Sequence, residues 1–96
     1  MATRGVFLWV VNDRMAFARW AELADCLRIK EDLPDYREAY DCEADTPIAG
    51  VLAAAMDAYY FEEMPMIAEP FSGILMSAYN DIDWIALATD FLERVK

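Results

Sequence analysis

The amino-acid sequence predicts a mainly α protein of four to five short helices, with a short N-terminal strand at residues 5–11 that would make it α+β. Over most of the chain, apolar residues recur at the spacing of one helix face. Residues that favour a helix start stand before four of these stretches. The 96 residues are 58% hydrophobic, which suits one modest core and a single domain over residues 1–96.

The first apolar run, Gly5–Val11, is the exception to helical spacing. It is rich in β-branched and aromatic residues and shows no alternation, which favours a strand covered on both faces. The same run also suits the first turns of a helix, because no breaker separates it from the next element. A strand needs a partner, for which Met64–Ala68 is the candidate, and pairing across a homodimer is the alternative.

The second element is an amphipathic helix that runs from Asn12 or Asp13, both good N-cap residues, to about Ile29. Its inner face is formed by residues at i, i+3, i+7 and i+10, namely Phe17, Trp20, Ala24 and Leu27.

A short helix over residues 35–42 follows Pro34, since proline favours the first helical position. Tyr36 and Tyr40 lie one turn apart on it. If the helix extends to residue 45, a second face carries a row of three acids, Glu38, Asp41 and Asp45.

Thr46 and Pro47 predict the next helix start, as an N-cap followed by proline at the first helical position. The helix Pro47–Phe61 is apolar nearly all round and is expected to be central and buried. Gly50 weakens it intrinsically, so burial must compensate.

Two further helices complete the expected fold, at Phe71–Tyr79 and Asp81–Val95. Asn80 or Asp81 is expected to cap the last helix, with acids in its first turn where the helix dipole favours them. Its inner stripe is Trp84, Leu87, Ala88, Phe91 and Val95.

Charge of one sign dominates most of the chain. Residues 38–93 contain no lysine, arginine or histidine across 56 positions, yet they carry twelve of the eighteen carboxylates. Residues 1–30 are slightly basic, and the formal net charge is −10. Such charge opposes direct binding to nucleic acid or to an anionic membrane, so we expect a basic protein partner. An acidic surface that serves only solubility is an equal alternative.

Catalytic and metal-binding patterns are missing from the sequence. Without histidine no Ser/His or Cys/His pair forms, and three glycines form no phosphate-binding loop. A carboxylate pair as acid and base stays open but uninformative among so many acids. No acid spacing matches an EF-hand loop, and two cysteines without histidine do not suit zinc. We therefore expect no enzyme, no cofactor and no metal.

Cysteine usage and the N-terminus bear on the compartment. Cys26 and Cys42 have no CxxC spacing, and the first residues do not form a signal peptide, so we expect free thiols in the cytoplasm. The longest uncharged run, Pro47–Met56, is too short to cross a bilayer.

Acids and tyrosines together predict a partner-binding patch. Helix carboxylates at i, i+3 and i+7 lie about 4.5 and 6 Å apart along the axis, against about 3.4 Å between phosphates of one DNA strand. With side-chain reach, such a row can imitate phosphates, and tyrosine is a common interface anchor. The candidate contact residues are Glu31, Asp32, Asp35, Tyr36, Glu38, Tyr40, Asp41, Glu43, Asp45, Glu62 and Glu63.

In size, charge and lack of catalytic groups, the chain resembles the small acidic anti-defence proteins of phages and mobile elements, the anti-CRISPR and antirestriction DNA mimics. The segment Ile82–Leu92, with Asp83-Trp84 and Asp90-Phe91, is similar to a helix of the ArdA-type antirestriction family. The longer pattern of that family is missing, so no functional residues are carried over. The resemblance implies a stoichiometric inhibitor that competes with nucleic acid for a basic defence complex, in the host cytoplasm if a phage encodes it.

Two other functions fit the same composition. An immunity protein or antitoxin that neutralises a nuclease toxin also presents acids to a cationic site. A small acidic adaptor would carry the acids without mimicry. In the inhibitor that the resemblance implies, the slightly basic residues 1–30 would be scaffold or dimer contact.

Overall fold

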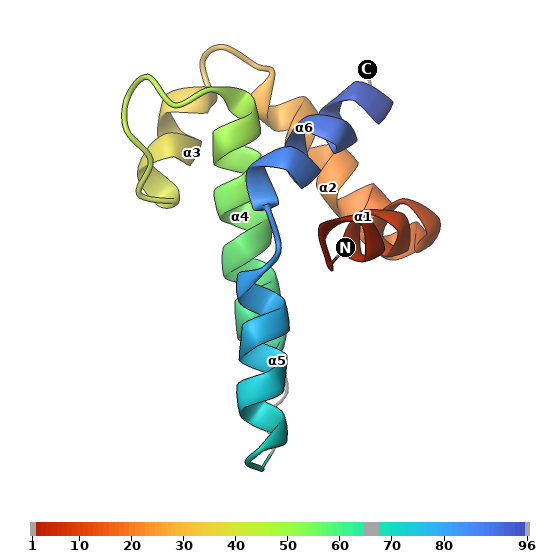
Figure 1. Ribbon diagram of the computed structural model, residues 1–96. Coiled ribbons are helices and arrows are strands. Elements are labelled where there is room, and N and C mark those ends of the chain that lie inside the picture. The colour runs from red at the N-terminus through yellow and green to blue at the C-terminus, as the bar shows by residue number, and fades with distance from the viewer. Residues whose placement is uncertain (1, 65–67, 96) are drawn as a thin grey trace.

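Helices make up most of the structure, a computed structural model that describes residues 2–64 and 68–95. Within these ranges the chain forms six helices and no strand (Figure 1). The prediction of a mainly α protein is confirmed, although the helices number six rather than four or five. In chain order they are α1 Ala2–Asn12, α2 Arg14–Leu27, α3 Leu33–Ala39, α4 Ile48–Glu63, α5 Phe71–Asn80 and α6 Trp84–Arg94.

The predicted strand at residues 5–11 is wrong, because these residues belong to α1. Val10 is fully buried, and its neighbours Val6 and Phe7 pack against the core. Leu8 and Trp9 are exposed, so burial follows the helical period. The helix packs against α2 and α6, which supply the cover that a strand would have needed. Of the proposed partner strand, residues 65–67 lie outside the described chain, and the residues on either side of them are not in a strand.

Asp13 makes the corner between α1 and α2. Its carboxylate accepts a hydrogen bond from the Ala16 N–H at 2.9 Å, which confirms it as the N-cap. Its own N–H donates to the Trp9 carbonyl at 2.9 Å, so the end of α1 and the start of α2 share one residue. Three of the four predicted inner residues of α2 are buried; the fourth, Phe17, is half-buried with its ring on Phe91.

Helix α4 is the centre of the fold, as predicted, and α2, α3 and α6 pack around it. Its buried residues are Val51, Leu52, Ala53, Ala55 and Met56. The helix begins one residue later than predicted: the N-cap is Pro47, whose extended backbone leaves its carbonyl to accept from the Val51 N–H. Thr46 therefore lies before the cap.

Gly50 has a steric reason to be in this helix. A Cβ at that position would lie 2.7 Å from the Thr46 side-chain methyl, which is closer than a real Cβ contact. The glycine lets the loop before α4 fold back over its first turn.

The inner stripe of α6 is confirmed, with Leu87, Ala88 and Phe91 buried. Its predicted cap is wrong. The N-cap is Asp83, whose carboxylate accepts from Ala86 N–H at 3.1 Å, whereas Asp81 ends α5. The shift arises because the chain needs residues 81–83 to turn between α5 and α6.

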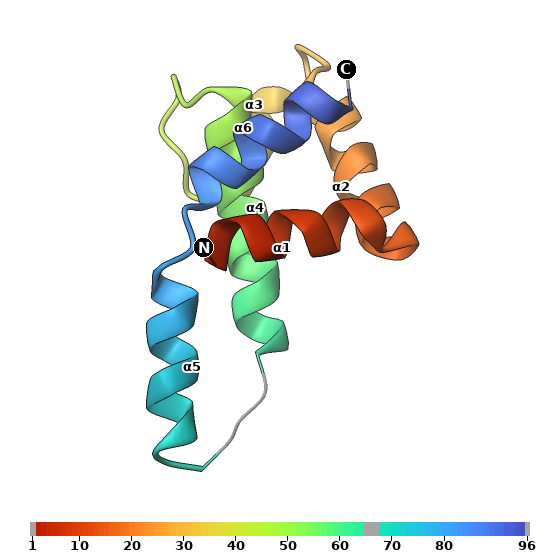
Figure 2. The ribbon, with the colours of Figure 1, turned by 45° about the vertical axis from the view of Figure 1, so that its right-hand side comes forward.

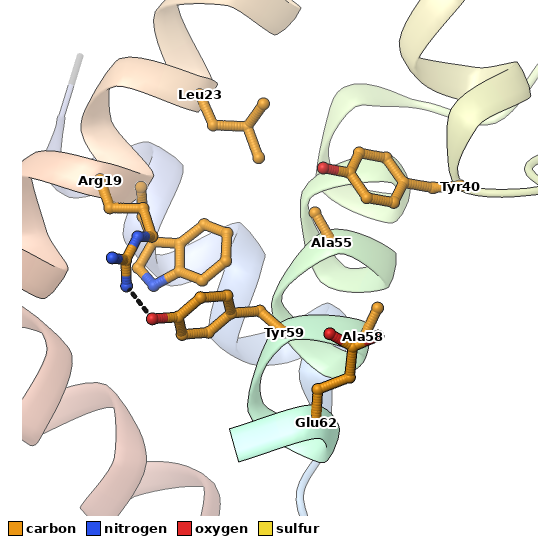
Figure 3. A pocket seen from close by; sticks show the side chains of 8 residues that line it. Arg19, Leu23, Tyr40, Ala55, Ala58, Tyr59 and Glu62 are labelled. Atoms are coloured by element: carbon orange, nitrogen blue, oxygen red, sulfur yellow. Dashed lines mark hydrogen bonds between the residues drawn. The ribbon is translucent and has the colours of Figure 1, made fainter.

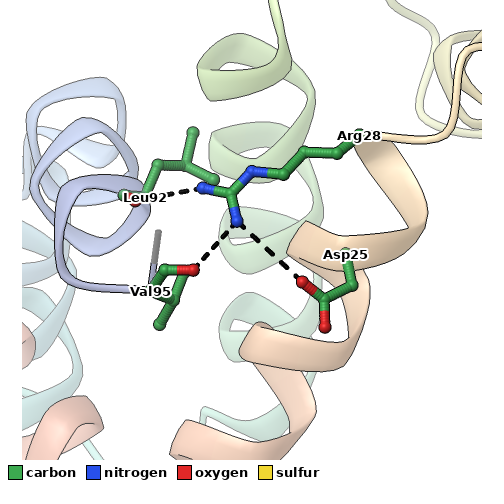
Figure 4. A network of polar contacts seen from close by, with 4 residues as sticks. All are labelled: Asp25, Arg28, Leu92 and Val95. Atoms are coloured by element: carbon green, nitrogen blue, oxygen red, sulfur yellow. Dashed lines mark hydrogen bonds and ion pairs between the residues drawn. The ribbon is translucent and has the colours of Figure 1, made fainter.

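Arg28 closes the other end of α6 (Figure 4). Its guanidinium donates to the carbonyls of Val95 at 2.9 Å and Leu92 at 3.1 Å, and lies 3.9 Å from the Asp25 carboxylate. Carbonyls at a helix C-terminus lack partners within the helix, so Arg28 satisfies them and fixes α6 against α2.

Helix α5 projects from the rest of the molecule (Figures 1 and 2). It has no buried residue, and it runs antiparallel to the C-terminal half of α4 and extends beyond the end of that helix (Figure 2). We call residues 57–63 of α4 together with α5 the arm. The arm makes the molecule elongated, with extents of 45 × 27 × 20 Å.

Candidate acidic interface

The candidate interface is built on α3 and the loops on either side of it, residues 31–45, which we call the acidic segment. It carries seven carboxylates and one base, Arg37. Asp32 is half-buried and the other six acids are exposed. In the described ranges, none of the seven is within ion-pair distance of a base. The acids are Glu31, Asp32, Asp35, Glu38, Asp41, Glu43 and Asp45.

Arg37 supports the acidic segment without neutralising it through an ion pair. Its Nε–H donates to the Thr46 carbonyl at 2.8 Å, and its side chain is half-buried. This bond ties α3 to the loop that leads into α4. Arg19 and Arg28 are hydrogen-bonded to other groups, and Arg14 is exposed at the start of α2. Lys30, which directly precedes the acidic segment, is exposed and makes no ion pair within the described ranges.

Helix α3 begins at Leu33, one residue before Pro34, and its first turn contains Asp35. An acid in the first turn is favoured by the helix dipole, so the negative charge stabilises the helix that displays it.

The end of α3 contradicts the predicted row of three acids on one helix face. The helix stops at Ala39, and Asp41 takes a left-handed conformation with φ of 57°. The Cys42 N–H donates to the Arg37 carbonyl at 2.7 Å and the Asp41 N–H to the Glu38 carbonyl at 3.2 Å. These two bonds define a Schellman motif, in which Asp41 occupies the position usually held by glycine. Asp41 and Asp45 therefore lie on a loop, and the seven acids form a cluster around α3.

Tyr36 and Tyr40, the predicted aromatic anchors, are half-buried and pack against the core. The Cys26 thiol interacts with the Tyr36 hydroxyl and raises the pKa of Tyr36. Both cysteines are free thiols, as expected. By packing against the core, the two tyrosines fix the backbone of the acidic segment to the body of the protein.

A pocket of about 410 Å³ lies beside the acidic segment, between α2, α4 and the end of α3 (Figure 3). The Arg19 guanidinium lies over the Tyr59 ring, 4.3 Å from its centroid, and donates to the Tyr59 hydroxyl. Tyr40 and Glu62 line the same pocket, on the side away from the Arg19 guanidinium (Figure 3). The lining residues are Arg19, Trp20, Leu23, Tyr40, Ala55, Ala58, Tyr59 and Glu62.

Glu62 and Glu63 do not join the acidic segment directly. They end α4, about 22 Å along its axis from its first residue at 1.5 Å per residue, whereas the segment leads into the start of that helix (Figure 1). Glu62 is linked to the segment through the pocket that it shares with Tyr40, and Glu63 does not line that pocket. The structure thus brings nine of the eleven predicted residues together and places these two on the arm.

An aromatic cluster around Tyr60 was not predicted from the sequence. Tyr60 stacks on Trp84 with an interplanar angle of 11° and a centroid distance of 5.9 Å, and accepts a hydrogen bond from the Trp20 indole at 2.9 Å. Burial raises the pKa of Tyr60, against a smaller lowering by the Trp20 bond. The sequence signal for this cluster was the adjacent pair Tyr59 and Tyr60, because two neighbouring aromatic rings on a helix point in different directions and each must pack against other side chains.

Across residues 2–64 and 68–95, no three acidic or cysteine side chains converge as the ligands of a metal ion would. None of the helices in these ranges combines the length and the apolar character that a bilayer crossing requires.

Comparisons with protein-family models, with curated proteins and with solved structures give no match to this chain.

Proposed function

We propose that this protein is a non-catalytic inhibitor that presents the acidic segment to the basic nucleic-acid-binding site of a host defence complex, as anti-CRISPR and antirestriction proteins do. One observation carries the proposal: seven carboxylates within 15 residues surround α3, and their one base, Arg37, bonds to the Thr46 carbonyl. The carboxylates of the acidic segment are therefore available to pair with the basic groups of a partner protein.

The physical basis is the gain from pairing exposed carboxylates with arginine and lysine. Charge-assisted hydrogen bonds to guanidinium groups are stronger than neutral ones, and a groove that attracts phosphates attracts carboxylates by the same field. The Schellman motif and the Arg37 bond hold the acids on a supported backbone, which lowers the entropy cost of binding. Occupation of the groove then excludes DNA or RNA.

Neutralisation of a nuclease toxin uses the same surface, because the active site of a nuclease is also a cationic nucleic-acid site. An acidic adaptor differs from both in one measurable property. Its binding to the partner does not compete with nucleic acid.

Competition is therefore the test of the proposal. The tagged protein is used to capture partners from a host extract, and the partner identified by mass spectrometry is purified. Fluorescence anisotropy then follows displacement of a labelled duplex from that partner by the protein. We expect full displacement at about one equivalent per site. Binding that forms a ternary complex with the duplex would contradict mimicry and support the adaptor function.

A further inference from the structure

The arm presents an uncovered apolar surface. Helix α5 has no charged residue, and three large side chains on the arm are mostly exposed: Phe61 at 54%, Phe71 at 64% and Ile74 at 64%. A helix of ten residues is marginal on its own in water, so most of its stability must come from packing. An exposed apolar surface of this kind marks an interaction site.

The charged residues of the arm and of the segments that flank it in sequence are all acidic. Residues 57–81 contain Asp57, Glu62, Glu63, Glu69 and Asp81 and no base. Glu62 and Glu63 end α4, where the helix dipole disfavours negative charge. These acids destabilise the isolated arm, and positive charge placed beside them would relieve that cost. The surface that covers the arm must therefore be apolar in its centre and basic at its edge.

The N-terminal helices of the same chain have this composition. Leu8, Trp9 and Met15 are exposed at 43%, 55% and 76%. Arg14, next to Met15, and Arg4, one helical turn before Leu8, are also exposed. Arg4 and Leu8 share one face of α1, since they lie four residues apart.

A groove of about 360 Å³ adjoins this face at the root of the arm. It is almost entirely apolar and is lined by α1, the end of α4, the end of α5, the α5–α6 connection and the start of α6. In Figure 2, α1 runs across the molecule at the level where the arm leaves the body. Its lining residues are Gly5, Val6, Trp9, Tyr60, Met64, Tyr79, Ile82 and Trp84.

We propose that a second copy of this chain covers the arm. Two protomers pair about a twofold axis with their arms antiparallel, so that each arm lies against α1 and the α1–α2 corner of its partner. Such an interface is reciprocal, so each acidic-to-basic contact occurs twice and the assembly closes as a dimer. A stable interface buries roughly 800 Å² per partner, about an eighth of the 6560 Å² surface of this chain.

This inference does not depend on the proposed function. The acidic segment lies beside the start of α4 and the arm at its other end (Figure 1), so a dimer through the arms leaves both acidic segments open. Failure of the dimer would leave the inhibitor proposal intact, and the reverse also holds.

Sedimentation equilibrium tests the dimer. We expect the wild-type protein to be dimeric, and Ile74→Asp to raise the dissociation constant about tenfold or more, since a charge would be buried against an apolar surface. Ile74 is exposed in the protomer, so the helix content by circular dichroism should stay unchanged. Phe71→Ser is the second variant at this surface. Ile29→Asp is the matched control, because Ile29 is also exposed but lies after α2, and it should leave the dimer intact.

Charge exchange tests the orientation. The variant Arg4→Glu/Arg14→Glu and the variant Glu62→Lys/Glu63→Lys should each dimerise poorly, because like charges meet. A mixture of the two should form mixed dimers, because both pairs of contacts then join opposite charges. A monomeric wild-type protein at the highest concentration reached, or a dimer indifferent to Ile74→Asp, overturns the proposal. So does a mixture that fails to pair, or a monomer whose arm binds a basic amphipathic peptide.

Discussion

The Tyr79 hydroxyl on α5 is hydrogen-bonded to both the backbone carbonyl, at 2.7 Å, and the carboxylate of Asp57 on α4. Among the described residues, these are the side-chain hydrogen bonds that join α5 to α4. The Tyr79 ring also packs edge-on against Phe61, with centroids 5.8 Å apart. One side chain thus joins the two helical parts of the arm, α5 and residues 57–63 of α4.

Removing that hydroxyl should release α5 locally. We expect Tyr79→Phe to speed amide hydrogen exchange in α5 while the buried residues of α4 keep their protection, with a stability loss of about 1 kcal/mol. Hydrogen-exchange mass spectrometry gives the measurement. Tyr40→Phe is the matched control, since the Tyr40 hydroxyl makes no hydrogen bond to any residue that the structure describes. Unchanged exchange in α5 after Tyr79→Phe would show that the hydroxyl is not the anchor.

The same contact should make the protein sensitive to alkali. Burial, and then the hydrogen bond to Asp57, raises the pKa of Tyr79 above its ordinary value of about 10. The folded state therefore holds the proton more tightly than the unfolded state. The resulting stabilisation is complete below about pH 10 and is lost as the pH rises above that value.

Urea unfolding between about pH 9 and pH 11 measures this effect. The free energy of unfolding should fall with pH in the wild-type protein and fall less steeply in Tyr79→Phe. Some slope should remain in the variant, because burial raises the pKa of Tyr60 in the same direction. Equal slopes in the two proteins would contradict the role assigned to Tyr79.

Asp41 should be replaceable by glycine with a gain in stability. Its φ of 57° is strained for a residue with a Cβ, and glycine removes that strain at the end of α3. Thermal unfolding should show Asp41→Gly to be more stable by up to about 1 kcal/mol. Asp41→Asn removes the charge and keeps a side chain that tolerates this conformation, so it should change stability little. A destabilised glycine variant would mean that the carboxylate itself holds the turn.

Substitutions at Gly50 and Thr46 should have non-additive effects on the free energy of unfolding. Gly50→Ala alone gains helix propensity of about 1 kcal/mol but forces the new methyl against the Thr46 methyl. Thr46→Ser removes that methyl, so Gly50→Ala should be more favourable in the Thr46→Ser background than in the wild type. A double-mutant cycle by urea unfolding measures the coupling. Additive effects would exclude the steric explanation for the glycine.

Partner binding should weaken steeply with salt. Six of the acids in the acidic segment are exposed, and exposed charges are screened over about 10 Å at 0.1 M salt. Isothermal titration at increasing sodium chloride checks this. A flat response would indicate an apolar interface and favour the adaptor function.

Helix faces were predicted well where long amphipathic segments and caps agreed. The inner faces of α2 and α6 and the central place of α4 follow from residues such as Trp20, Met56 and Phe91, which are buried as expected. The α1 run failed because seven consecutive apolar residues suit a buried strand and a helix equally well. Packing against α2 and against α6, which is distant in sequence, decides between them.

The residues of the acidic segment were predicted from the sequence, but their arrangement in space was not. The sequence around Asp41 does not predict a left-handed residue, because glycine is the residue usually found in that conformation at the end of a helix. The acids therefore cluster around a short helix instead of forming a line. The exposure of α5 was missed for a different reason, because an apolar stretch such as Phe71–Tyr79 predicts a helix but not whether the fold covers it.

The central claim is that the acidic segment binds by charge, and isosteric neutralisation tests it most directly. The variant Asp35→Asn/Glu38→Gln/Asp41→Asn keeps the shape of the segment and removes three of its charges. A control removes three exposed acids elsewhere, as Glu22→Gln/Asp81→Asn/Asp90→Asn. The account predicts that the first variant keeps its thermal midpoint and binds the captured partner about 10- to 100-fold more weakly than the control. Equal affinity of the two variants would contradict it.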